Sequence, residues 1–342
     1  MSTRPIRLTH LFLLAAVLFT AAAPMTTAAA AATAAESPIT TEAVRAFWWG
    51  DFDALEKQNT LLKHPGHIAG DGSSDLEMFR IGLGKVLEAG GDNRESYLLE
   101  LEKLTLQWAT AHPASPLAHI LYARALVEHG WSYRGAGYAK DVPPQAWEDF
   151  HAYLRRAAEY LVNHADVALT DSYAHATLLI VGKGLNWDNK QMTAIAQDGL
   201  KRNPEDINLY FEASVTLLPK WGGDARALDK YIRQVAEQTK GIYGMGMYSR
   251  LYSYAADNDY GHALFDSSLA DWPTMKQGYQ DMHARYPSNT RRNRYAYMAC
   301  MAKDKNTLNA LLDELGPSVE ASEWGPNPQR SLEGCRRWAK QG

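Results

Sequence analysis

Hydrophobic residues recur along most of the chain at the spacing of an amphipathic helix. In residues 97–111, Leu98, Leu101, Thr105 and Trp108 share one face, while charged residues occupy the other. The same period runs through further segments at 117–130, 150–165, 172–184, 191–203, 209–218, 225–240, 294–303 and 307–316. No stretch shows the two-residue alternation of a half-buried strand. The pattern predicts an all-α protein.

Two kinds of signal mark where these helices end and begin. The residue before a proline avoids helical geometry, so a helix is expected to end at His112, Asn203 and Tyr286. A second signal is an aspartate four positions before a hydrophobic residue. As an N-cap, its carboxylate would accept hydrogen bonds from the free backbone N–H groups of the next helix. Such aspartates stand at Asp51, Asp188, Asp224 and Asp304.

The spacing of the breaks indicates a repeated unit. The prolines after the three helix ends, at positions 113, 204 and 287, lie 91 and 83 residues apart. Each interval holds about two helical hairpins of roughly 40 residues. We therefore predict stacked antiparallel helical hairpins in a tetratricopeptide-like superhelix, although the tetratricopeptide consensus itself is not met. An α/α toroid is the alternative all-α arrangement.

The stretch Leu217–Asp224, LLPKWGGD, joins two of the predicted helices. Gly222 and Gly223 permit the backbone to reverse direction, and Asp224 can cap the following helix. We interpret the stretch as the turn of a helical hairpin.

The N-terminal segment differs from the rest of the chain. Arg4 and Arg7 precede a hydrophobic run at Leu11–Ala23, and an alanine-rich stretch follows. These features are typical of a secretory signal peptide. A retained membrane anchor is the less favoured alternative, because a span needs about 20 apolar residues. We predict an exported protein, periplasmic or secreted, with a signal peptide at 1–34, a short linker at 35–45 and a single helical-repeat domain at 46–342.

Composition narrows the possible partners. The formal net charge of −4 gives no sign of nucleic-acid binding. After the leader no segment approaches transmembrane length, so we do not expect a membrane-embedded protein. Cys300 and Cys335 are the two cysteines of the chain. An exported protein can join such a pair in a disulfide, and two buried free thiols are the alternative.

The candidate binding residues are aromatic and basic residues at predicted turns. Trp131, Arg134 and Tyr138 lie close together in the segment WSYRGAGYAK. There a guanidinium can stack on a ring and bind a carboxylate through two hydrogen bonds. Lys220 and Trp221 belong to the turn described above. We expect these residues to line the edge of a binding surface. The alternative is that each tryptophan packs under its own turn and that Arg134 stabilises its own loop.

A run of basic residues, Arg291–Arg294, follows a predicted N-cap at Ser288. Positive charge at a helix start opposes the helix dipole, so an anionic group is expected nearby. An aspartate or glutamate of the fold is the favoured partner, and a ligand is the alternative.

The chain carries no motif of a familiar enzyme or cofactor site. G-x-S-x-G, H-E-x-x-H and Walker-type patterns are absent. His64 and His67 lack the helical frame and cysteine partners of a typical metal site. We expect neither a metal nor a cofactor. An enzyme is unsupported rather than excluded, because a pair of catalytic carboxylates is a spatial feature that sequence spacing does not reveal.

Two segments carry a resemblance to a known family. Pro219–Gly223 (PKWGG) and His112–Ala139 (HPASPLA…GWSYRGAGYA) resemble the hallmark of the bacterial family called domain of unknown function 4034. Cys300 and Cys335, the latter within EGCRRWA, fit the same pattern. The resemblance would extend from about Phe47 to Ala339. It implies a helical-repeat fold without an established activity, and it supplies no catalytic residues.

Three functions are compatible with these features. The first is a non-enzymatic protein of the cell envelope that binds a protein or peptide partner, because stacked hairpins usually serve recognition. The second is an all-helical hydrolase or lyase acting on cell-wall glycan or peptide, which requires two carboxylates in an aromatic-lined cleft. An immunity protein against an exported toxin is a special case of the first.

Overall fold

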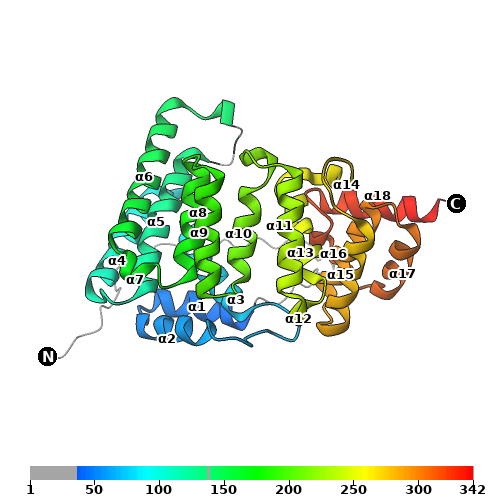
Figure 1. The fold of residues 1–342 in the computed structure, drawn as a ribbon, viewed down its shortest axis with the longest axis horizontal. Helices are drawn as coiled ribbons and strands as arrows, with labels where there is room; N and C mark the ends of the chain where they lie inside the picture. Colours follow the sequence, from blue (N-terminus) through cyan, green and yellow to red (C-terminus); the bar gives the residue numbers. More distant parts are fainter. Residues whose placement is uncertain (1–36, 136, 138, 342) are drawn as a thin grey trace, which may run out of the picture.

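A computed structural model describes residues 37–135, 137 and 139–341. The predicted signal peptide at 1–34 lies outside the described residues. In the described part the chain is all-α (Figure 1), with one isolated β-bridge between Ile68 and Ser74 and no strand. The predicted fold class is therefore confirmed.

The helices pack in consecutive antiparallel pairs along an elongated array (Figure 1). Its first part comprises α1 (Pro38–Trp48), α2 (Phe52–Leu62), α3 (Asp75–Glu88), η1 (Gly91–Asn93), α4 (Arg94–Ala111), α5 (Pro116–Arg134), η2 (Ala139–Asp141), α6 (Pro144–Asn163), α7 (Ala165–Ala168), α8 (Ser172–Gly184) and α9 (Asn189–Arg202). Its second part comprises α10 (Ile207–Thr216), η3 (Pro219–Trp221), α11 (Ala225–Gln238), α12 (Lys240–Tyr243), α13 (Gly246–Ala255), η4 (Ala256–Tyr260), η5 (Gly261–Ala263), α14 (Leu264–Ser267), α15 (Trp272–Arg285), α16 (Asn289–Met301), α17 (Lys305–Leu315), η6 (Ala321–Glu323) and α18 (Pro328–Lys340). The array runs from α4–α6 at one end to α17–α18 at the other, an open row rather than a toroid.

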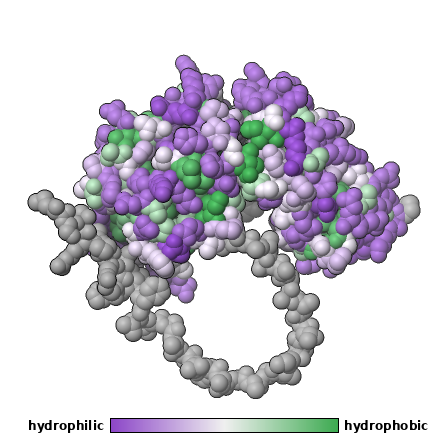
Figure 2. Space-filling view, turned by 90° about the horizontal axis from the view of Figure 1, so that it is seen from below, coloured by the Kyte–Doolittle hydropathy of each residue, from purple (hydrophilic) through white to green (hydrophobic). Residues whose placement is uncertain are grey.

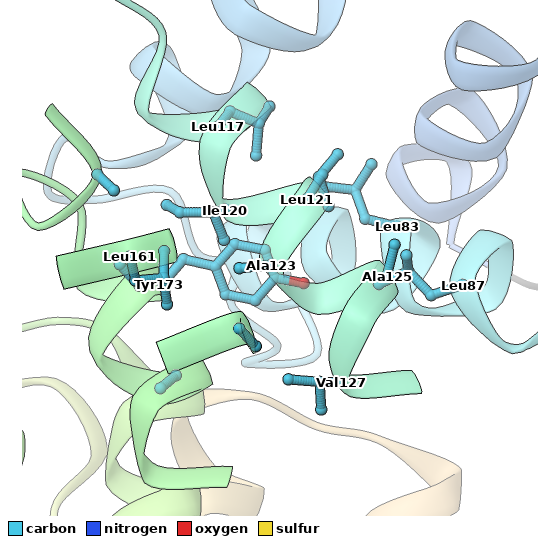
Figure 3. Packing of buried hydrophobic residues seen from close by; sticks show 14 of the residues in the cluster. Leu83, Leu87, Leu117, Ile120, Leu121, Ala123, Ala125, Val127, Leu161 and Tyr173 are labelled. Carbon is cyan, nitrogen blue, oxygen red and sulfur yellow. The ribbon is translucent and has the colours of Figure 1, made fainter. Parts of the chain in front are cut away.

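The hydrophobic core has two clusters that meet in the middle of the row. Leu200 of α9 and Tyr231 of α11 pack against both. In the first cluster α5 lies at the centre, with α3, α6 and α8 around it (Figure 3). Helices α5 and α8 are buried on most faces, whereas α9 and α11 bury a single stripe. The array therefore has an inner layer of apolar helices and an outer layer of amphipathic helices.

The predicted helix boundaries follow local hydrogen bonding. The four aspartates proposed as N-caps each accept a hydrogen bond from a backbone N–H two or three residues further on. The helices before the three prolines end where expected, with His112, Asn203 and Tyr286 as the C-cap residues of α4, α9 and α15. Cys300 of α16 and Cys335 of α18 lie at disulfide-bonding distance, with an S–S length of 2.04 Å. The predicted pairing of the two cysteines is confirmed.

The predicted linker at 35–45 does not match the structure, because helix α1 already begins at Pro38. Thr40 and Ala43 are buried against α3. Thr40 Oγ1 donates to Met78 O at 2.9 Å, and Gly82 has no Cβ to separate the two helices. The buried residues of α1 have helical spacing in the sequence, but the pattern covers few turns. It also follows an alanine-rich stretch, so the sequence did not indicate where the helix begins.

Two features fasten the first helices to the rest of the array. Arg80 of α3 is 3% exposed and contacts the N-cap aspartates of two other helices, Asp171 of α8 and Asp206 of α10. The connection 63–74 between α2 and α3 reaches the second half of the array, where Gly72 lies against the ring of Tyr286. A Cβ on Gly72 would be 2.7 Å from that ring, and its φ of +78° also favours glycine. This connection brings residues from the start of the chain to α16.

Candidate functional site

Trp131 and Arg134 lie at the end of α5, and the guanidinium of Arg134 is bound to its own loop. Its Nη1 donates to Gly135 O at 2.9 Å and to Gly137 O at 2.5 Å. The same group lies over the rings of Trp131 and Trp147, at 5.8 and 5.5 Å from their centres. These contacts are those of the alternative interpretation, an arginine that stabilises its own loop. Tyr138, the third predicted residue of this segment, lies outside the described residues.

Lys220 and Trp221 form the 3-10 turn η3, as expected for the turn of a hairpin. Gly222 has a φ of +84°, and a Cβ on Gly223 would lie 2.0 Å from Leu217 O, so this turn requires both glycines. Lys220 donates its backbone N–H to Asp259 Oδ2 at 3.1 Å and its Nζ to Asn258 O. The turn is thereby fixed to η4.

The structure does not bring the two predicted pairs into contact with each other, but places them along one rim. The ring of Trp131 contacts Phe150, which packs on Gly184 at the end of α8. Lys183 of the same helix places its Nζ 5.3 Å from the centre of the Trp221 ring. The ends of α5, α8 and α10 therefore share this aromatic and basic rim.

A different group of residues, in the second half of the array, has the chemistry of a binding site. The basic run at the start of α16 has its expected acidic partners at two of three positions. Arg294 binds Asp257 through two hydrogen bonds, of 3.1 and 2.9 Å, and also contacts Glu323 at 3.4 Å. Arg292 Nε lies 3.5 Å from Glu314. Acidic residues of the fold thus balance two of the three positive charges, as the sequence predicts.

Arg291 is the exception. Its Nη2 donates to the hydroxyl of Ser73 at 3.3 Å. Its Nη1 is buried and has no hydrogen-bond acceptor among the residues that the structure describes. Burial lowers the pKa of Arg291, and the neighbouring guanidinium of Arg250 lowers it further, against the attraction of Asp71 and Glu77. A cationic donor without an acceptor is costly in a folded protein.

Arg291 opens into a cavity of about 200 Å³ between α10, α13, α15 and α16, here called the arginine pocket. Its walls combine three guanidinium groups, two carboxylates, aromatic rings and hydroxyls. The lining residues used below are Phe211, Arg250, Tyr254, Asp257, Tyr279, Arg291, Arg294 and Glu323.

Arg250 forms the second basic wall of the arginine pocket. Its Nη2 lies 3.3 Å from Glu77 of α3, and its guanidinium lies 5.2 Å from the centre of the Phe211 ring. Glu77 and Ser73 do not line the cavity, but they contact its Arg250 and Arg291 from the N-terminal part of the chain. The packing of the first helices against the second half of the array therefore helps to position both guanidinium groups.

A larger groove lies on the other side of Arg291. It has a volume of about 440 Å³ between α15, α16 and α17, and it shares Tyr279 and Arg291 with the arginine pocket. Tyr286 and Tyr295 add aromatic surface, and Asn306 and Gln280 add amide groups. Such a groove has room for a short stretch of polypeptide, since ligand pockets usually measure about 300–1,000 Å³.

The charges in the pocket are nearly balanced. Asp257 and Glu323 share the single guanidinium of Arg294, while Arg250 has Glu77. Burial raises the pKa of Glu323, and Glu320 and Asp257 act in the same direction against Arg294. Both carboxylates that line the pocket are held by one guanidinium. A proton-transfer role for either would require breaking that ion pair, which disfavours the hydrolase or lyase alternative at this pocket.

Two buried histidines, which could in principle serve catalysis or bind a metal, have structural roles in this fold. His129 is fully buried and contacts Glu95 at 3.1 Å and Glu102 more closely, which ties α5 to α4. His175 similarly binds Asp198 at 2.9 Å. Within residues 37–135 and 139–341, no group of three or more histidine, cysteine or acidic residues has the geometry of a metal site.

Sequence reasoning identified α16 as a place that needs an anion but not the pocket. The run Arg291–Arg294 was the available signal. No signal in the local sequence indicated the other residues of the site, Arg250, Ser73 and Phe211, because each comes from a different part of the chain. The only route to them from sequence would be residue pairs that vary together among relatives.

The fold and the site define an all-α array of helical hairpins with a basic, aromatic-walled pocket in its second half. No protein-family profile, no curated protein and no solved structure matches this chain. The resemblance to domain of unknown function 4034 therefore stays a prediction. Among the described helices, none is both long and apolar enough to cross a bilayer.

Proposed function

We propose that the protein is an exported, non-enzymatic helical-repeat protein of the cell envelope that binds a protein or peptide partner at the arginine pocket and the adjoining groove. Stacked helical hairpins are most often used for recognition. The cysteine pair at disulfide distance is compatible with export. The observation that carries the proposal is Arg291, a residue that lines the cavity and whose buried Nη1 has no acceptor in the described chain.

The surface around the array supports recognition through specific polar contacts. Hydrophilic residues dominate the uncovered part of the face in Figure 2, with hydrophobic residues in small patches between them. A partner held on such a surface needs a few well-placed charged anchors, and a buried guanidinium beside aromatic rings is an effective one. The rim with Trp131, Arg134, Lys220 and Trp221 is the other candidate contact surface.

The test is capture of a partner from the native cell envelope by the purified mature protein. Arg291→Gln removes the positive charge that lacks an acidic partner in the pocket. Arg337→Gln is the matched control, because Arg337 forms an exposed pair with Glu333 on α18 and lines neither the pocket nor the groove. We expect the wild type and the control to retain a partner that Arg291→Gln loses. A partner retained equally by all three would exclude the arginine pocket. In that case a Trp131→Ala, Arg134→Ala, Trp221→Ala triple variant tests the rim. If the wild type captures no partner, the proposal fails.

A further inference from the structure

We infer that the arginine pocket recognises the free α-carboxylate at the C-terminal end of a peptide chain. The inference rests on the proposed function and specifies the chemical group that the pocket accepts. It follows from the hydrogen bonding on α16, from the charges around the cavity and from its size.

Helix α16 itself shows what a guanidinium at this place binds. Arg294, three residues after Arg291, holds Asp257 with two nearly parallel hydrogen bonds, the usual arrangement of arginine with a carboxylate. Arg291 makes one hydrogen bond, to the uncharged hydroxyl of Ser73, and its buried Nη1 has no acceptor in the described chain. A planar carboxylate is the group that complements the free side of this fork.

The surrounding charges favour one negative charge over two. Asp257 and Glu323 line the same cavity, and Glu77 lies next to it on Arg250. A phosphate monoester carries a charge of about −1.5 to −2 at neutral pH and would meet all three carboxylates. A carboxylate brings a single charge to Arg291. An acidic stretch of polypeptide is disfavoured for the same reason as a phosphate.

The size and walls of the cavity favour a chain end over a side chain in the middle of a chain. About 200 Å³ accommodates a carboxylate together with one side chain, and the adjoining groove of about 440 Å³ accommodates the residues before it. A chain end carries its carboxylate and its last side chain on one carbon atom. Arg291 can then hold the carboxylate while Phe211 and Tyr254 contact the side chain. The pocket selects an apolar or basic last residue, since an acidic one would face Asp257 and Glu323.

The experiment uses an array of hexapeptides attached by their N-termini and varied at the last two positions. Each peptide is synthesised with a free carboxylate and as the carboxamide. The mature wild-type protein, Arg291→Gln and the control Arg337→Gln are applied in parallel, and circular dichroism verifies that all three are folded. Inorganic phosphate is the competitor. We expect free-acid peptides with apolar or basic ends to bind wild type and Arg337→Gln. Binding should fall at least tenfold for the amide form and for Arg291→Gln, and phosphate should not displace the peptides.

The other outcomes separate the chain-end inference from the proposed function. Equal binding of acid and amide forms would show that the carboxylate is not recognised, and displacement by phosphate would assign the pocket to phosphate. No binding on the array, together with envelope capture that depends on Arg291, would leave the proposed function in place and remove the chain-end inference. Array binding without a captured envelope protein would keep the carboxylate site and replace the protein partner by a free peptide.

Discussion

Replacement of Arg80 by methionine tests the contact that fastens the first helices to the array. Arg80 donates to Asp206 Oδ2 at 2.5 Å, to Asp171 Oδ1 at 3.1 Å and to Ser172 Oγ at 3.2 Å, and it lies over the ring of Tyr173. The side chains of Asp171 and Asp206 are 0% and 1% exposed. Methionine has a similar length, so the substitution leaves the packing largely intact and removes the charge.

The expected loss follows from the two buried carboxylates that would remain. Removing one partner of a buried ion pair costs about 3–5 kcal/mol, because the other charge stays in the interior without compensation. Asp171 keeps Lys63 at 3.0 Å and Asn59 at 2.9 Å. Within the part of the chain that the structure describes, Asp206 keeps only the backbone N–H of Leu209 as a hydrogen-bond donor to its side chain. Asp206 therefore accounts for most of the loss, and Tm should fall by roughly 6–20 °C at about 2–4 °C per kcal/mol.

The pH dependence gives the prediction a second signature. Although burial opposes it, Arg80 and Lys63 hold the pKa of Asp171 below its ordinary value of 3.8. A carboxylate whose folded-state pKa is lowered stabilises the protein above its unfolded-state pKa, and this stability is lost as the pH falls through the folded-state value. In Arg80→Met the contribution of Arg80 to this lowering is removed, while Lys63 and Asn59 keep theirs. The difference in unfolding free energy between variant and wild type should therefore shrink as the pH falls from 7 to about 3, below the ordinary pKa of 3.8.

The assay is urea unfolding followed by far-UV circular dichroism at both pH values. Arg45→Met is the matched control, since Arg45 forms an exposed pair with Glu42 on α1 and water screens such pairs, so that they contribute little to stability. A loss below about 1 kcal/mol for Arg80→Met, or a loss independent of pH, would refute the assignment of Arg80 as the fastening contact.

Three further predictions concern local features. His129 has a raised pKa because its hydrogen bonds to two glutamates outweigh its burial. Its contribution to stability is thus complete below pH 6.5 and lost as the pH rises through the raised value, so His129→Gln should flatten the decline of unfolding free energy in that range. Cys300→Ser, which removes the bond to Cys335, should cost about 3 kcal/mol in urea unfolding under oxidising conditions, and none under reducing conditions. Gly223→Ala should lower Tm while Gly241→Ala, in open space, should not, because only the first Cβ meets backbone.

The elements of this fold were predictable because their signals are local. Asp224 and Asp304 cap helices through backbone N–H groups two or three residues away, and such a contact needs nothing but the neighbouring sequence. The turn is also specified locally, by the positive φ of Gly222 and by the close approach of Gly223 to Leu217 O. The start of α1 at Pro38 was missed because one short helical stripe next to an alanine-rich leader has too few turns to show a period.

The candidate site was predictable only in part, and the reason is distance along the chain. Trp131 and Trp221 were chosen because aromatic residues at turns are visible in sequence, yet their exposure and partners depend on helices elsewhere. The run around Arg291 correctly indicated a need for anions. The positions of Asp257 and Glu323 in the fold decide that Arg294 has acidic partners. Nothing in the local sequence distinguishes Arg291 from its neighbours.

The amino-acid sequence by itself determined the all-α class, most helix boundaries, the hairpin turns and the pairing of two cysteines, since each depends on periodicity, on contacts within a few residues or on there being one possible pair. The tertiary structure decided the sites. Arg80 meets Asp206 across 126 positions, and Ser73 meets Arg291 across 218. Such contacts form only after the row of hairpins has closed against the first three helices, because only packing brings these side chains out of water to the same place.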